Sequence, residues 1–145
     1  MSQVTFPNEQ HVYQVAWALI RVGIGITFII HGYPKITGGI EVWTWLGDQM
    51  KWLGIDFWKP TWGFLAAVAE LGGGILLTVG ILTRPAALLL FLTMVVAFLS
   101  QLFGGMDYNS YSHSLKLLFV FAAFVLAGGG NYSLDVVLQR RKQKL

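Results

Sequence analysis

The 145-residue chain contains no cysteine and few charged side chains. The lack of cysteine excludes a disulfide framework, a thiol–disulfide relay and any metal or iron–sulfur centre held by cysteine. Charged residues make up 12% of the chain, whereas soluble domains carry about 25%. Hydrophobic residues make up 55%. So short a chain cannot cover that much apolar surface with polar groups, and it therefore requires lipid around it.

Several recognisable motifs are also missing. The chain has no nucleophile elbow, no P-loop and no dinucleotide-binding glycine pattern. The glycines at 72–74 lie inside an apolar stretch, where close helix packing explains them better than phosphate binding. The first 11 residues contain no Lys or Arg and so lack the positive region of a secretory signal peptide. We therefore expect the first apolar stretch to remain in the mature protein.

Four apolar stretches approach the length of about 20 residues that a helix needs to cross a bilayer. They predict spans at about 12–31, 62–82, 85–103 and 112–129. Gly32 and Pro34 are expected to end the first helix, because proline removes a backbone donor and restricts the residue before it. The turn before Pro85 is so short that the second and third spans must be antiparallel neighbours. The predicted fold is all-α, a single-domain integral membrane four-helix bundle.

A short amphipathic helix in the membrane interface is predicted within residues 32–60, after the first span. Apolar side chains recur there at spacings of three and four, at Trp43, Leu46, Met50 and Leu53. Tryptophans crowd the same region, at Trp43, Trp45, Trp52, Trp58 and Trp62. Tryptophan favours the headgroup level, so anchoring is the simpler interpretation of this segment. A lid over a pocket is the alternative.

Basic residues predict the orientation of the bundle. With four spans, both termini share one side with Arg84, and this side also holds Arg140, Arg141, Lys142 and Lys144. The lysines on the other side are balanced by acidic residues. The positive-inside rule places both termini in the cytoplasm and the chain in the cytoplasmic (inner) membrane. The basic tail directly follows an apolar segment, so we expect it to contact the lipid bilayer and not nucleic acid.

Two charged residues lie deep inside predicted spans. Arg21 and Glu70 are each about 12–14 Å from the nearer end of their spans at 1.5 Å per residue. An isolated charge at the bilayer centre costs about 2.5–3.5 kcal/mol on insertion scales, so we expect the two side chains to form a central ion pair. Such a pair serves either as a structural clasp that sets helix register or as a proton or ligand site.

A second polar group is predicted near the outer ends of the spans. Its members come from three segments and are His31, Lys35, Gln101, His113 and Lys116. Hydrogen-bond donors beside aromatic residues suit the recognition of a quinone, so these residues form a candidate ligand-binding pocket. Two histidines are also able to ligate haem or a metal ion. No metal-ligand spacing such as HExxH is present, so neither is expected.

Three sets of residues resemble the motifs of the DoxX family of small membrane proteins. The first span resembles the family's opening signature of Arg, Gly, Phe, His-Gly and Lys, here at Arg21, Gly23, Gly25, Phe28, His31, Gly32 and Lys35. A second-span motif is matched by Glu70, Gly72, Gly73 and Gly80. The closing pattern Gly-x-Gly-x-x-Ser-Leu-Asp is matched by Gly128, Gly130, Ser133, Leu134 and Asp135. The resemblance covers nearly the whole chain and implies four helices.

The resemblance implies a membrane subunit of a quinone-linked redox system, because some members of the family are thought to join membrane redox complexes. It implies no catalytic residue, and whether the chain is an enzyme is left open. The alternatives are a non-catalytic assembly or scaffold protein, such as a homo-oligomer, and a small transporter with Glu70 as a proton-coupled site.

Overall fold

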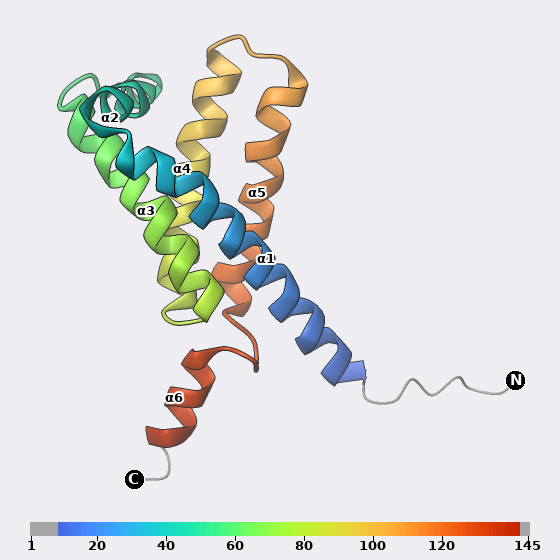
Figure 1. The fold of residues 1–145 in the computed structure, drawn as a ribbon. Coiled ribbons are helices and arrows are strands. Elements are labelled where there is room, and N and C mark those ends of the chain that lie inside the picture. Colours follow the sequence, from blue (N-terminus) through green and yellow to red (C-terminus); the bar gives the residue numbers. More distant parts are fainter. Residues whose placement is uncertain (1–8, 143–145) are drawn as a thin grey trace, which may run out of the picture.

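The computed structural model describes residues 9–142, and these form helices almost throughout (Figure 1). Four helices are long and apolar enough to cross a membrane: α1 (Glu9–Thr37), α3 (Lys59–Val79), α4 (Thr83–Phe103) and α5 (Tyr108–Ala127). The short helix α2 (Gly39–Gly47) and the 3-10 helix η1 (Asp48–Leu53) join α1 to α3, and α6 (Leu134–Lys142) follows α5. The predicted all-α membrane bundle is confirmed, as is a short helix after the first span.

The bundle has two distinct ends. In Figure 1, α2 and η1 lie at the same end as the connection from α4 to α5, and we term this the α2 end. The turn from α3 to α4, the loop after α5 and α6 lie at the opposite end, termed the α6 end. Helix α6 was not predicted from the sequence.

Helix α1 is longer than predicted. We expected Gly32 and Pro34 to end it, but α1 continues through both residues to Thr37. A proline removes only one helical hydrogen bond, and in an apolar surrounding the neighbouring backbone groups have no better partners than the helix itself. The helix ends instead at Gly38 and Gly39, where Gly39 has a positive φ of 72°.

Glycines set the distance between α1 and α3. A Cβ atom on Gly25 would overlap Thr78 Oγ1 and would lie 2.9 Å from the Gly74 carbonyl oxygen. A Cβ atom on Gly32 would lie 2.6 Å from the backbone nitrogen of Leu71. Such close approach of two backbones is the usual role of small residues in membrane helices. Gly32 is therefore a packing residue and not a helix terminator.

The core lies where all four long helices meet. Its buried side chains are Phe28, Leu77, Ala87, Leu90, Met94, Phe121 and Phe124. Phe28 of α1 contacts Phe121 of α5 with ring centroids 5.0 Å apart, and Trp17 contacts Phe124 at 4.5 Å. Most other large apolar side chains remain exposed, which is the arrangement expected of a protein surrounded by lipid.

Candidate functional site

A partly buried ion pair joins α1 to α3. The Nζ atom of Lys35 lies 2.5 Å from Oε2 of Glu70. The Glu70 side chain is 7% exposed and the Lys35 side chain 30% exposed. Glu70 follows Lys59, the first residue of α3, by 11 residues, which places it near the middle of that helix. The pair exists because α1 continues past Pro34 and so carries Lys35 along the surface of α3.

Helix α2 contacts the backbone of Lys35 and the surface of α3. The Trp43 indole Nε1 donates a hydrogen bond to the Lys35 carbonyl oxygen at 3.0 Å. The Trp43 ring also contacts Phe64 of α3, with centroids 4.9 Å apart. A Cβ on Gly63 would overlap the Trp43 carbonyl group, so α2 lies directly on the backbone of α3. Trp43 thus packs α2 against α1 and α3, whereas Trp45, Trp52 and Trp58 are exposed as anchors would be.

Arg21 does not pair with Glu70, and that prediction is wrong. The Arg21 side chain is buried and donates to three carbonyl oxygens, those of Leu77, Thr78 and Tyr132. The packing of Gly25 on Gly74 and Thr78 explains the difference. It sets Arg21, one turn earlier in α1, beside the end of α3 near Gly80, roughly 15 Å along the helix from Glu70.

The predicted pairing required the first span to begin at the level where the second span ends. In fact the first part of α1 extends past the end of α3, as the oblique path of α1 shows in Figure 1. The Arg21 guanidinium occupies the α6 end of the bundle and binds the last carbonyl groups of α3. These groups have no partners inside their own helix and carry its negative dipole end, so a cation stabilises them.

The closing motif is built around the same arginine. The Asp135 carboxylate accepts hydrogen bonds from the backbone nitrogens of Leu82 at 2.8 Å and Thr83 at 3.0 Å, and so caps the start of α4. Its own backbone nitrogen donates to the Gly80 carbonyl oxygen at 2.9 Å. Burial alone would raise the pKa of Asp135. The hydrogen bonds from Thr83 and Leu82 and the nearby Arg21 charge outweigh it and lower that pKa.

Further contacts tie the loop after α5 to the start of α1. Trp17 Nε1 donates to the Gly128 carbonyl oxygen at 2.9 Å, and the backbone nitrogen of Asn131 donates to Gln14 Oε1 at 2.8 Å. Together with the contacts of Arg21 and Asp135 they form a clamp at the α6 end, which was not predicted from the sequence. A signal for α6 was present in the sequence. Ser133 and Asp135 follow a glycine-rich loop, and a serine with an acidic residue soon after it is typical of the start of a helix.

The five residues of the predicted outer pocket are not brought together. Lys35 pairs with Glu70, and Gln101 accepts a hydrogen bond from Ser114 Oγ at 2.9 Å. The other three, His31, His113 and Lys116, are exposed on their helices. Within residues 9–142 no group of three or more acidic or histidine side chains is placed to hold a metal ion.

The two histidines are exposed on different helices, His31 on α1 and His113 on α5. His31 precedes Gly32, which packs on Leu71, so His31 is level with the middle of α3, roughly 18 Å from its first residue. His113 follows Tyr108, the first residue of α5, by only five residues, or about 8 Å. The structure does pair Lys35 with Glu70, and His31 lies one helical turn before Lys35 in α1.

Comparisons with known proteins agree with the fold. The model of the DoxX family matches residues 16–102, which include the first two motifs but not the closing one. The inner membrane protein YqjF of Escherichia coli (strain K12) is 32% identical over 127 residues, covering 83% of this chain and 90% of that protein. No match was found among solved structures. A family model that spans more than half the chain, and a relative of nearly equal length, leave one conclusion: the chain belongs to the DoxX family.

Proposed function

We propose that this protein is a membrane subunit of a quinone-linked redox system and that His31, Lys35 and Glu70 form its ligand site. The observation that carries the proposal is an exposed histidine one turn from a partly buried ion pair, level with the middle of the apolar helix α3. The family resemblance supports the redox association. The relative named as an inner membrane protein supports that location, and the basic residues of the α6 end support a cytoplasmic position for it.

The chemistry of the three residues suits a quinone. A polar group that faces hydrocarbon without a hydrogen-bond partner is costly, so an exposed His31 at this depth favours a ligand that dissolves in the bilayer and carries acceptors. A quinone ring supplies two carbonyl oxygens. Lys35 has three N–H donors, of which Glu70 takes one, and its side chain is 30% exposed, so it retains donors for a second acceptor.

The protein's part in such a system is to bind and orient. Reduction of a quinone to a quinol takes two electrons and two protons. Because the chain has no cysteine, it holds no cysteine-ligated redox centre of its own, and the proposal places the electron donor in a partner subunit. Glu70 holds the Lys35 ammonium in place through their ion pair, and the packing of Gly32 on Leu71 fixes His31 beside them.

The test is the melting temperature of the detergent-solubilised protein with and without a short-chain ubiquinone. Binding stabilises the folded protein by about 2.7 kcal/mol at a hundredfold excess over the dissociation constant, so we expect the melting temperature to rise. His31→Ala should abolish that rise without lowering the melting temperature of the unliganded protein, because His31 is exposed.

His113→Ala is the matched control, since His113 is also an exposed helical histidine but lies on α5, whereas the Lys35–Glu70 pair joins α1 to α3. It should respond to quinone like the wild type. Loss of the response in both variants would support one larger pocket that includes Gln101, His113 and Lys116, as predicted from the sequence. No response in the wild type would contradict quinone binding altogether.

A second candidate function is that of a non-catalytic assembly or scaffold protein. This candidate is favoured by Arg21 and Asp135, which hydrogen-bond to backbone groups of other segments and so hold the helices together. A wild type that gains no stability from quinone, yet co-purifies with a membrane redox complex, would favour this candidate.

A further inference from the structure

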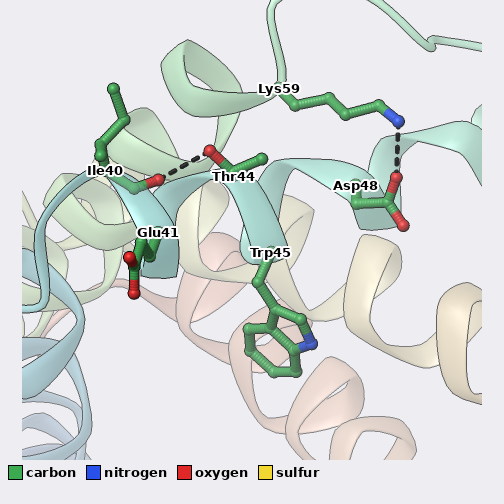
Figure 2. Close-up of a pocket in the computed structure, with 6 residues that line it drawn as sticks. All are labelled: Ile40, Glu41, Thr44, Trp45, Asp48 and Lys59. Carbon is green, nitrogen blue, oxygen red and sulfur yellow. Dashed lines mark hydrogen bonds and ion pairs between the residues drawn. The ribbon is translucent and has the colours of Figure 1, made fainter.

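A shallow groove at the α2 end does not include the residues of the proposed quinone site. Its volume is about 490 Å³, and it is lined by Ile40, Glu41, Thr44, Trp45, Asp48 and Lys59 (Figure 2). All but Lys59 come from α2 and η1, so the groove runs along the short helix that follows the first span. Lys59 joins it from the start of α3.

One face of this helical stretch combines acidic and aromatic side chains. Glu41, Trp45 and Asp48 are spaced four and three residues apart and therefore share a face. Figure 2 shows the Glu41 carboxylate and the Trp45 ring on the same side of the ribbon. The Trp45 side chain is 65% exposed. Glu41 is exposed, and within residues 9–142 it takes part in no ion pair.

The other charges of the groove compensate one another. The Asp48 carboxylate lies 2.7 Å from Nζ of Lys51 and 2.7 Å from Nζ of Lys59, and Lys59 also contacts Asp56 at 2.8 Å. The hydrogen bonds from Lys51 and Lys59 lower the pKa of Asp48 to about 2, so it stays ionised. Two lysines thus balance two aspartates, and Glu41 adds one uncompensated negative charge beside an indole ring.

We infer that this groove binds the headgroup of phosphatidylethanolamine from the leaflet at the α2 end. A primary ammonium group donates charge-assisted hydrogen bonds to a carboxylate and is attracted to the face of an indole ring, and Glu41 and Trp45 offer both. Ile40 supplies apolar surface for the start of the acyl chains.

The position of the groove favours a lipid over a soluble amine. Trp45, Trp52 and Trp58 are all exposed around α2 and η1, and exposed tryptophans gather at the headgroup level of a bilayer. The charge pattern favours ethanolamine over other headgroups. Phosphatidylcholine has a cation without N–H donors, and phosphatidylglycerol has no cation to meet Glu41.

The experiment compares lipids added at equal mole fraction to the full-length protein in detergent, with the melting temperature as the readout. We expect phosphatidylethanolamine to raise it more than phosphatidylcholine or phosphatidylglycerol does. Glu41→Gln should weaken the apparent affinity for phosphatidylethanolamine by about tenfold, the low end for a hydrogen bond to a charged group. Trp45→Ala should weaken it as well.

Glu9→Gln is the matched control, because Glu9 is an exposed carboxylate at the start of α1, outside the groove. It should bind phosphatidylethanolamine like the wild type. Glu41→Gln without lipid should melt like the wild type, since Glu41 has no ion pair to lose within the described residues 9–142. Equal stabilisation by the three lipids, a preference for phosphatidylglycerol, or an unchanged lipid response in Glu41→Gln would each overturn the inference.

Discussion

The ion pair between Lys35 and Glu70 permits a quantitative test of how α1 packs on α3. Lys35→Met leaves the Glu70 carboxylate buried, with 7% of its side chain exposed, and without its partner. Breaking a buried pair in this way typically costs 3–5 kcal/mol, and we expect a loss of about 3 kcal/mol. Glu70→Gln leaves Lys35, whose side chain is 30% exposed and can extend toward the interface, so we expect a smaller loss of about 1–2 kcal/mol.

The double variant distinguishes direct contact from separate effects. When both charges are removed, no unpaired charge remains, so the combined loss should be smaller than the sum by about 1.5 kcal/mol or more. The free energy of unfolding in mixed micelles, titrated with a denaturing detergent, provides the measurement. Strictly additive losses would refute a direct contact between Lys35 and Glu70.

The same cycle on Arg21 and Glu70 is the control. These residues are separated by roughly 15 Å along α3, so their effects should add within about 0.5 kcal/mol. Strong coupling between Arg21 and Glu70 would refute the register set by Gly25 and Gly32. It would restore the central pair predicted from the sequence.

Two further predictions concern the packing of α1 and the clamp at the α6 end. Gly25→Ala should lower the free energy of unfolding by about 2 kcal/mol, because its Cβ would overlap Thr78 Oγ1. Gly23→Ala on the same helix meets nothing within 4 Å and should be neutral or slightly stabilising, and equal losses in the two variants would contradict the close packing of Gly25 on α3. Asp135→Asn should cost about 1 kcal/mol at pH 7, because it weakens the cap of α4. The pKa of Asp135 is lowered on folding, so its stabilising effect is present above the ordinary aspartate pKa and is lost as the pH falls through the lowered value. The difference between wild type and variant in acid and neutral unfolding series should therefore shrink at low pH, and a difference that grows instead would contradict this account.

The sequence was sufficient for the properties that depend on local composition. Apolar stretches of about 20 residues predict membrane helices wherever they occur, because the cost of unpaired backbone groups in hydrocarbon leaves few alternatives. The short turn before Pro85 likewise required two antiparallel neighbours, and α3 and α4 are joined there. The periodic apolar residues Trp43, Leu46, Met50 and Leu53 predicted a short helix after the first span, and the structure has α2 there, continued by the 3-10 helix η1.

Local rules failed where packing outweighed them. Gly32 and Pro34 look like a helix end in the sequence, yet Gly32 is needed for contact with Leu71 and Pro34 is tolerated inside α1. The closing motif was recognised only as part of the family resemblance. Its role depends on Arg21, more than 100 residues earlier in the chain, whose guanidinium bonds to the Tyr132 carbonyl oxygen.

Which charges meet was decided by the tertiary structure alone. The sequence determined that Arg21, Lys35 and Glu70 lie in or next to apolar helices, and therefore that each needs a partner inside the protein. It could not determine the choice among them, because depth counted from predicted span ends assumes helices of equal length and tilt. The glycine contacts between α1 and α3 set the register instead, and a register shift of a few residues moves a side chain by a full helical turn. Hydrophobicity is carried by each residue, whereas the pairing of charges depends on where two helix surfaces fit together.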